Sequence, residues 1–389
     1  MELREGYKLS EFGLIPNDWE IQTVGNVSIP VRGGSPRPAG SPKYFNGNFI
    51  PWLTVAALTN IPVSQLYVSE TETFLTQEGS LYSRTLEKGT LIIANSGATL
   101  GVAKILAIKC CANDGIAALL DIDKEVSPEY LVYFINTKTK YLREVVATGN
   151  GQPNLNTGLI SNIKIPLPPT KTEQTAIATA LSDADALINS LSTLIAKKRN
   201  IKQGAMQQLL KPKEGWEVKK LGDVCDIRKG QLITESTRIN GHIPVIAGGK
   251  TPAYFHNKPN RLGRTITISG SGASAGYVSY HNYPIFASDC STIEESDSYS
   301  IEFIFYLMQL FQNKIYKMQT GGAQPHIHPS DLNPILVPIP IEKTEQTRIA
   351  TILSDMDAEI QALETKLEKY RKIKLGMMQN LLTGKIRLV

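Results

Sequence analysis

The sequence lacks the features that identify a membrane-spanning protein or a disulfide-stabilised secreted one. No apolar run approaches the ~20 residues that span a bilayer, and the opening residues, MELREGYKLSEFG, lack the apolar core of a signal peptide. The four cysteines form no CxxC pair, and the adjacent Cys110 and Cys111 are typical of small buried residues rather than of a disulfide framework. These absences favour a protein of the reducing cytoplasm.

Recognisable catalytic motifs are missing as well. The chain has no H-E-x-x-H, no Walker A loop and no nucleophile elbow. Residues 270–276, GSGASAG, resemble a dinucleotide-binding loop, but the strand-like VSYHNYPIF follows where a helix is needed, so we interpret them as a hairpin turn. His326 and His328 have no third ligand beside them, so the pair does not indicate a zinc site. We therefore expect no catalytic residue, metal or cofactor on this chain.

The net charge is small and unevenly placed. The 389 residues carry a formal charge of +5, with 42% hydrophobic and 20% charged side chains, which is typical of a soluble protein with two or more domains. Residues 1–170 hold 14 basic and 15 acidic side chains and residues 214–341 hold 11 of each, so the surplus lies in 171–213 and 342–389. Charge alone therefore does not identify a nucleic-acid-binding protein.

What the sequence does contain is a long internal repeat. Residues 171–210 and 343–382 are identical at 25 of 40 positions without a gap. The period is too long for a solenoid, so we infer a duplicated domain and connector. Weaker matches precede each copy: NDWEIQTVGNV (17–27) matches EGWEVKKLGDV (214–224), NSGATLGVA (95–103) matches GSGASAGYV (270–278), and TGNGQPNLN (148–156) matches TGGAQPHIH (320–328). The stretches between these matches differ.

Both repeated segments are predicted to be long helices. Apolar residues recur every three or four positions, close to the 3.5-residue spacing of a coiled-coil seam, which only Lys198 interrupts. Thr170 and Glu173 can form a capping box at the start of the first helix. About 40 residues at ~1.5 Å each give a rod of roughly 60 Å. Neither rod can bury its stripe alone, so we expect the two helices to pack together, antiparallel, with the globular domains at opposite ends.

The globular parts have mixed patterns. TLIIANS and TITISGS predict strands that end in Gly/Ser turns, and the prolines of IPLPP and ILVPIPI exclude a central-strand position. The predicted fold class is therefore α+β, with two globular domains separated by two long antiparallel coiled-coil helices in a pseudo-two-fold tandem repeat.

Two kinds of segment are candidates for DNA contacts. Amide and imidazole side chains alternate along the Gln-Pro turns, and amides can donate and accept together, as the edge of adenine requires; alternatively they satisfy turn backbone. Basic residues beside glycines in PVRGGSPRP and DIRKGQ suit phosphate or guanine; alternatively they are solvated loop charges. The candidate DNA-binding residues are Arg32, Arg37, Lys43, Ser96, Thr99, Asn150, Gln152, Asn154, Arg228, Lys229, Lys250, Ser271, Ser274, Gln324 and His326.

A second set of residues is a candidate for binding a protein partner. Gly204 and Gly376 lie at matched positions inside the predicted helices, at a cost of ~1 kcal/mol each relative to alanine, which suggests a close helix approach or a docked partner. Apolar residues outside the seam either form a second contact surface or pack on the neighbouring domain. The candidate partner-binding residues are Gly204, Met206, Leu210, Gly376, Met378 and Leu382.

Four stretches together resemble the specificity subunit of type I restriction–modification systems: YKLSEFGLIPNDWE at 7–20, the two KTEQT…IAT.LSD.DA segments, and LLTGKIRL at 381–388. The resemblance covers essentially the whole chain. It implies target-recognition domains at 1–169 and 213–341, with conserved long helices at 170–212 and 342–389. It also implies a non-catalytic subunit that reads a split, asymmetric DNA target.

The same resemblance implies partners and cofactors. The expected partners are double-stranded DNA, two modification subunits that methylate adenine N6, and restriction subunits that join through the complex. S-adenosylmethionine, ATP and Mg are expected on those subunits and not on this chain, and no membrane is expected as a partner. Two other classes stay open: a coiled-coil adaptor that binds only proteins, and a self-contained enzyme, which the lack of methyltransferase and nuclease motifs disfavours.

Overall fold

A computed structural model describes residues 5–147, 153–237, 239–322 and 324–388. The chain divides into two compact units: unit 1 is Met1–Ser192 with Lys366–Val389, and unit 2 is Thr193–Thr365. The division passes through both repeated segments, so each unit contains one globular domain and a part of each long helix.

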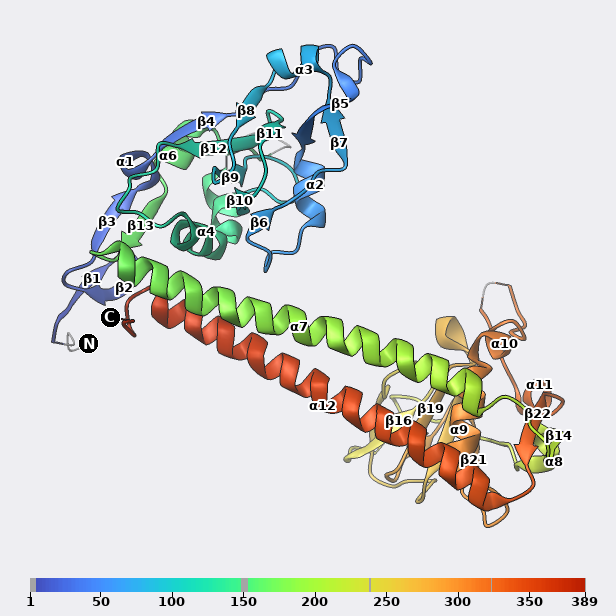
Figure 1. The fold of residues 1–389 in the computed structure, drawn as a ribbon. Helices are drawn as coiled ribbons and strands as arrows, with labels where there is room; N and C mark the ends of the chain where they lie inside the picture. The colour runs from blue at the N-terminus through green and yellow to red at the C-terminus, as the bar shows by residue number, and fades with distance from the viewer. Residues whose placement is uncertain (1–4, 148–152, 238, 323, 389) are drawn as a thin grey trace. The chain divides into compact units, whose positions relative to one another are not determined.

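Unit 1 contains two small sheets and two separate strand pairs (Figure 1). One sheet has the order β4-β12-β9-β10-β6 and the other β7-β5-β11-β8; β1 pairs with β2, and β3 with β13. The strands are β1 (Tyr7–Ser10), β2 (Gly13–Pro16), β3 (Glu20–Thr23), β4 (Ile29–Arg32), β5 (Phe45–Leu53), β6 (Tyr67–Val68), β7 (Thr73–Leu75), β8 (Arg84–Leu86), β9 (Leu91–Ala94), β10 (Ala103–Leu106), β11 (Cys110–Ala112), β12 (Ile116–Leu120) and β13 (Lys164–Leu167). The short helices are α1 (Val24–Val27), α2 (Val55–Asn60), α3 (Gln77–Leu81), α4 (Pro128–Thr137), α5 (Thr139–Tyr141), a π-helical turn (Leu142–Val146) and α6 (Thr157–Ser161).

Unit 2 repeats this plan with fewer strands. Its sheets have the orders β15-β21-β18-β19 and β17-β16-β20, and β14 pairs with β22. The strands are β14 (Trp216–Lys220), β15 (Arg228–Lys229), β16 (Ile243–Ile246), β17 (Tyr254–His256), β18 (Thr265–Ser269), β19 (Val278–His281), β20 (Phe286–Ala287), β21 (Cys290–Glu294) and β22 (Leu336–Pro340). The short helices are α8 (Leu221–Val224), a 3-10 turn (Gly272–Ser274), α9 (Ile301–Leu310), α10 (Gln312–Tyr316) and α11 (Pro329–Leu332).

The predictions of strands in TLIIANS and TITISGS are confirmed, because β9 and β18 occupy these stretches. The proline-rich strands β13 and β22 each pair with only one neighbour in the described chain. This arrangement agrees with the expectation that proline, which cannot donate to a ladder, keeps them out of central positions.

The repeated segments form two long helices, as predicted: α7 (Lys171–Leu209) and α12 (Lys343–Leu381). Thr170 caps α7, because its hydroxyl oxygen accepts from the amide of Glu173 (3.2 Å). Within each unit the helices run antiparallel, because residues with higher numbers on α7 pair with residues with lower numbers on the C-terminal segment. The pairs are Glu173 with Arg387 and Asp185 with Lys374 in unit 1, and Arg199 with Glu364 and Lys202 with Asp357 in unit 2.

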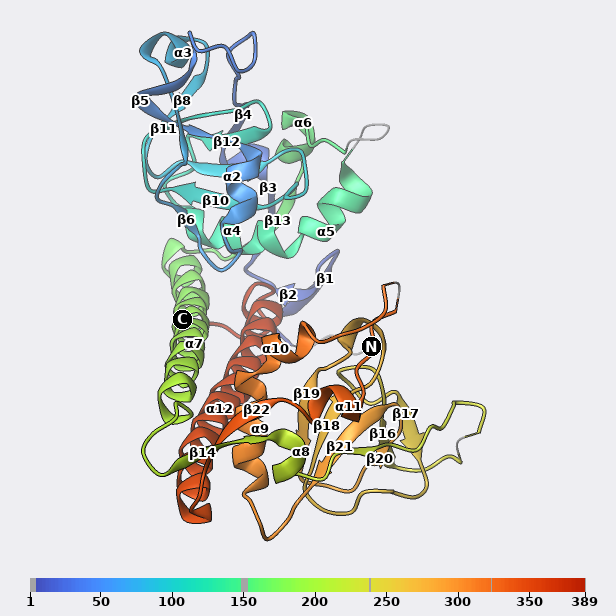
Figure 2. The same ribbon diagram turned by 90° about the vertical axis from the view of Figure 1, so that its right-hand side faces the viewer.

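Helices α4 and α9 take the same place in their units. Each begins at a serine, whose hydroxyl oxygen accepts from an amide three residues on: Tyr130 for Ser127 and Phe303 for Ser300, at 3.3 Å in both. Residues 130–135 of α4 are all buried, as expected of a helix covered on every side. Figure 1 shows α4 between the five-stranded sheet and α7, and Figure 2 shows α9 between the four-stranded sheet and α12.

The polar residues of the repeat fasten each long helix to its own domain. In unit 1 the side-chain oxygen of Gln174 accepts from the amide of Ser127 (2.8 Å) at the start of α4. In unit 2 the matched Gln346 accepts from the amide of Ser300 (2.9 Å). Both glutamines are buried, so each satisfies a backbone group that the helix start leaves without a partner.

A second matched set joins three elements in each unit. In unit 1 the Asp185 carboxylate accepts from the Tyr133 hydroxyl (3.0 Å) and pairs with Lys374 of α12 (2.6 Å). Burial raises the pKa of the Tyr133 hydroxyl far above its ordinary value, which keeps it a donor. The unit 2 counterparts, at 2.8 and 2.6 Å, are Asp357, Tyr306 and Lys202. The matched positions of the repeat thus hold matched domain contacts.

Candidate nucleic-acid interface

In unit 1 the Gly/Ser turn after β9 lies against the Gln-Pro turn. Ser96 and Asn154 pair as an isolated antiparallel bridge, and the amide of Leu155 donates to the carbonyl oxygen of Asn95 (2.8 Å). On the same turn the hydroxyl oxygen of Thr99 lies 3.4 Å from that of Thr59. The structure therefore brings together three candidate residues that are up to 58 positions apart in the sequence.

Asp114 connects two candidate arginines to this turn. Arg32 donates from Nε to the backbone oxygen of Asp114 (2.7 Å), and Asn95 donates to the same oxygen (3.3 Å). The Arg37 guanidinium lies 3.6 Å from the Asp114 carboxylate with its side chain 74% exposed, so a phosphate can replace that weak surface pair. The set Arg32, Arg37, Ser96, Thr99 and Asn154 is called turn cluster 1.

Unit 2 has the same arrangement with different side chains. Ser271 and His326 form the matching bridge, and the amide of Gly272 donates to the carbonyl oxygen of Pro325 (3.0 Å). The rings of His326 and His328 are stacked, with centroids 6.2 Å apart and planes 8° apart. The loop before Lys250 is held nearby, because the Ser269 hydroxyl donates to the Gly248 carbonyl oxygen (2.6 Å). The set Lys250, Ser271, Ser274, Gln324 and His326 is called turn cluster 2.

Asp114 of unit 1 has a counterpart in unit 2, Asp289, and the sequence analysis identified neither of them. The Ser271 hydroxyl donates to the Asp289 carboxylate, as the Ser35 hydroxyl donates to Asp114 (2.7 Å) in unit 1. The two aspartates stand before matched strands, in ANDGI and ASDCS. That short match is the one signal in the sequence that could have identified them. The Asp289 carboxylate holds Ser271 of the Gly/Ser turn, and the Asp114 carboxylate holds Ser35 of the loop that carries Arg37.

The basic pair Arg228 and Lys229 forms strand β15 beside β21. The next residue, Gly230, donates its amide to the carbonyl oxygen of Cys290 (2.8 Å), which places the end of β15 close to Asp289. Arg228 already pairs with Asp226 (2.6 Å), so its charge is partly neutralised within the chain. Lys229 is exposed.

Other candidates are not brought into the clusters. Lys43 pairs with Glu78 (2.7 Å) and lies over the ring of Tyr44, in the surroundings of the second sheet. Asn150 and Gln152 lie outside the described residues, so their role stays a prediction. Asn156 caps α6, because its side-chain oxygen accepts from the amide of Leu159 (2.9 Å). For this residue of the alternating series, the alternative of satisfying turn backbone is correct.

The interpretation of Met206, Leu210 and Leu382 as a partner surface is wrong, because all three are buried. Met206 and Leu210 are buried in the core of unit 2 and Leu382 in the core of unit 1, with Met378 packed against it. These side chains complete the cores of the chain itself, because each lies where a long helix meets its own domain. The alternative, that they pack on the neighbouring domain, is the correct one.

The matched glycines Gly204 and Gly376 behave differently. No heavy atom of the described chain lies within 4 Å of a Cβ built on either of them, apart from the chain neighbours and the backbone of their own helix. A close approach between helices therefore does not explain the two glycines. A docked partner at these positions stays a prediction.

Each turn cluster offers hydroxyl, amide or imidazole groups together with cationic side chains. Such groups can contact phosphate oxygens and base edges. Within the described ranges, no group of three or more His, Cys, Asp or Glu is placed to hold a metal ion. In the same part of the chain, no helix combines the length and the apolar character needed to cross a bilayer.

The family model of the type I restriction modification DNA specificity domain matches the chain twice, over residues 16–202 and 213–371. These matches cover most of the chain, which therefore belongs to this family. Each match contains a globular domain and most of the long helix that follows it, so the duplicated organisation is confirmed. The chain is the non-catalytic specificity subunit of a type I restriction–modification system, the subunit that recognises DNA sequence.

Similar proteins are known along the whole length of the chain. The type I restriction enzyme MjaVIII specificity subunit of Methanocaldococcus jannaschii is 26% identical over 96% of this chain and 94% of its own. The MjaIX specificity subunit of the same organism is 24% identical over 98% and 96%. Among solved structures, the S subunit of a type I system from M. genitalium aligns over 98% of both chains with a TM-score of 0.68 at 17% identity. The predicted fold class is confirmed.

Proposed function

We propose that the chain reads a bipartite, asymmetric double-stranded DNA target, with one half-site for each turn cluster. The observation that carries this proposal is that the two units have equivalent backbone bridges at these turns but different side chains on them. Asn154 and His326 stand at equivalent bridges to Ser96 and Ser271. Asparagine can bond to an adenine edge through two atoms, whereas imidazole offers one donor and one acceptor on different nitrogens. Two such turns select different bases.

We further propose that two modification subunits dock on the repeated helices and that restriction subunits join through them. A pseudo-two-fold pair of helices suits two copies of one partner, since it offers each copy an equivalent surface. In support, the matched Ile201 and Ile373 are exposed on α7 and α12, and each lies one turn before a matched glycine that has open space around it. In this proposal S-adenosylmethionine, ATP and Mg lie on the partner subunits.

The test changes one turn at a time in the assembled complex. Asn154→Ala should relax base preference in one half-site and His326→Ala in the other, each by about 1–3 kcal/mol of discrimination. Sequencing of methylated positions in DNA treated with each complex measures this directly. Because neither side chain is fully buried, both variants should assemble. Relaxation at both half-sites by one variant, or at neither, would contradict independent reading.

A salt titration of DNA binding separates this function from the adaptor alternative. A DNA-reading complex should lose affinity steeply as salt rises, because phosphate contacts release counterions. An adaptor that binds only proteins would add no sequence preference to its complex. Equal affinity for target and non-target DNA at every salt concentration would therefore favour the adaptor.

A further inference from the structure

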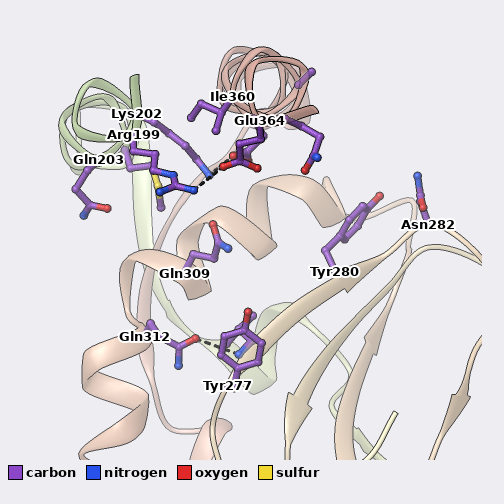
Figure 3. A pocket seen from close by; sticks show the side chains of 15 residues that line it. Arg199, Lys202, Gln203, Tyr277, Tyr280, Asn282, Gln309, Gln312, Ile360 and Glu364 are labelled. Atoms are coloured by element: carbon purple, nitrogen blue, oxygen red, sulfur yellow. Dashed lines mark hydrogen bonds and ion pairs between the residues drawn. The ribbon is translucent and has the colours of Figure 1, made fainter. Parts of the chain in front are cut away.

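Unit 2 contains an open pocket of about 1060 Å³ between its globular domain and its parts of α7 and α12. Figure 3 shows the space below the two long helices, with Tyr277 and Tyr280 on the strand side and the amides of Gln309 and Gln312 at the helices of the domain. Arg199 and Glu364 close it from above. The DNA-contact candidates of turn cluster 2 do not line this pocket.

In unit 1 the equivalent region is filled by the chain itself. Strand β6 pairs in parallel with the outer edge of β10. The amide of Ile105 donates to the carbonyl oxygen of Leu66, and that of Ala107 to the carbonyl oxygen of Val68, at 2.9 Å in both cases. Residues 55–68, which carry α2 and β6, lie between β5 and β7; unit 2 passes from β16 to β17 with no helix or strand between them.

Two side chains of unit 1 hold this inserted segment in place. The Ser64 hydroxyl donates to the side-chain oxygen of Asn189 on α7 (3.0 Å). The Lys104 ammonium, with the residue 0% exposed, donates to the carbonyl oxygens of Pro62 and Gln65. The segment is therefore fastened to both the long helix and the sheet.

Position by position, the walls of the unit 2 pocket match the residues that hold this segment. Strand β19 corresponds to β10 and is the last strand of its sheet in the described chain. Tyr280 corresponds to Ile105, and the register with β18 directs its amide outward to the open edge. Gln361 of α12 stands at the repeat position of Asn189. Ser279 stands where Lys104 stands, so the long side chain that underlies the segment in unit 1 is missing.

The charges of the pocket indicate what it binds. Arg199 pairs with Glu364 (2.5 Å) and Lys202 with Asp357 (2.6 Å), so these cations are neutralised and the pocket does not suit a polyanion. The other polar side chains that line the pocket are Tyr277, Tyr280 and several amides, which donate to and accept from peptide groups. One of them already does so: Gln312 accepts from the amide of Val278 (3.0 Å).

We propose that this pocket binds an extended, uncharged segment of a partner protein, which adds to β19 as a parallel strand in the way that β6 adds to β10. The outward amide and carbonyl of Tyr280 supply the backbone pairing, as in other cases of strand addition to a sheet edge. An apolar side chain takes the place of Val68, which is 0% exposed in unit 1. Because unit 1 fills its own edge, each chain binds one such segment. This activity goes beyond DNA recognition and does not depend on it.

The test uses the full chain and a synthetic peptide, IPVSQLTVS, which has the sequence of residues 61–69 with threonine in place of Tyr67. Threonine is chosen because the Tyr280 hydroxyl already donates to Glu302 (2.8 Å), the contact that Tyr67 makes with Glu129 (3.0 Å). We expect the peptide to shift the amide resonance of Tyr280 in isotope-labelled protein. The amide of Ile105, whose edge is occupied, should not shift.

Three variants give the controls. Tyr280→Pro removes the outward N–H without removing a donor to β18 and should weaken the peptide at least about tenfold, whereas Tyr280→Phe should bind as the parent does. Ser279→Lys supplies the ammonium that Lys104 supplies in unit 1 and should tighten binding about tenfold.

The proposal is overturned if millimolar peptide shifts no pocket amide, or if a folded Tyr280→Pro variant binds the peptide as tightly as the parent. If that variant does not fold, the Ser279→Lys comparison decides alone, and an unchanged or weaker affinity overturns the proposal. If sedimentation shows that the parent chain self-associates and that a folded Tyr280→Pro variant does not, the edge binds a second copy of the chain instead of a partner protein.

Discussion

Unit 1 and unit 2 share a frame but differ in how deeply their polar contacts are buried. The Asp185 side chain of unit 1 is 5% exposed, whereas that of its counterpart Asp357 is 42% exposed. Lys104 lies under an inserted strand in unit 1, whereas in unit 2 the residues on either side of Ser279, Val278 and Tyr280, line an open pocket. The comparison teaches that the repeat fixes which groups meet, while the segments between the repeats decide how much water reaches them.

The tail after α12 shows the same contrast between copies. Arg387 pairs with Glu173, whose side chain is 1% exposed, and also with Asp18 (3.0 Å). These contacts raise the pKa of Arg387 above its ordinary value, with the Glu173 hydrogen bond as the largest cause. The repeat partner of Glu173 is Glu345, which pairs instead with Arg348 one turn away on the same helix (2.8 Å). One copy of the motif thus joins distant parts of the chain, and the other makes a local surface pair.

The largest expected effect follows from this difference. Arg387→Ala should destabilise unit 1 by about 3–5 kcal/mol, because it leaves the Glu173 carboxylate buried without its main partner. Arg348→Ala, which removes the partner of the matched Glu345, should have no measurable effect, because water reaches both side chains of that surface pair. Urea unfolding followed by pulsed thiol labelling can assign the loss, because Cys110 and Cys111 are buried in unit 1 and Cys225 and Cys290 in unit 2. Equal losses from the two variants would refute the contrast.

A somewhat smaller effect is expected at the matched aspartates. Asp185→Asn should cost unit 1 about 3 kcal/mol, because the Asp185 carboxylate is itself only 5% exposed and its pair with Lys374 is therefore shielded from water. Asp357→Asn should cost unit 2 about 1 kcal/mol or less, because water reaches that carboxylate. Thermal unfolding of the two variants, with the same thiol labelling, measures both values. A larger loss from Asp357→Asn would mean that burial does not determine which of the two ion pairs contributes more to stability.

A smaller effect than that of Asp185→Asn is expected from a pH dependence that arises in unit 2. His281 is 7% exposed in β19, where its Nε2 lies 2.9 Å from the Thr267 hydroxyl oxygen and its Nδ1 lies 3.4 Å from that of Tyr283. Burial lowers its pKa to about 4. The folded state therefore resists protonation that the unfolded state accepts below about pH 6.5, so the stabilising effect is complete above that pH and falls as pH drops toward 4.

Between pH 8 and pH 5 this histidine should cost unit 2 about 2 kcal/mol of its free energy of unfolding. Urea unfolding at the two pH values, followed by circular dichroism, gives the loss for the parent chain. His281→Gln keeps a hydrogen-bonding side chain that does not titrate, and this variant should lose about 2 kcal/mol less over the same range. The same pH dependence in both proteins would exclude His281 as its source.

The sequence predicted the long helices and their antiparallel packing well, because a regular apolar spacing has few other solutions. The same reasoning failed for Met206 and Leu210, since a seam defined by two helices leaves out the domain that packs on their ends. The Tyr133, Asp185 and Lys374 contacts were not anticipated at all. Their residues come from three separate elements, and no local pattern marks a contact that only the packing of those elements creates.

By itself the sequence determined the duplication, the helical connectors and the family, because each of these is a property of order along the chain. Only the tertiary structure decided which polar groups share a turn, since Ser96 and Asn154 meet through strand pairing across 58 positions. It also decided that one sheet edge is closed and that its counterpart has no neighbouring strand among the described residues. An edge is closed when another segment supplies backbone donors and acceptors at the correct register, and the sequence of β19 alone does not say whether such a segment lies beside it.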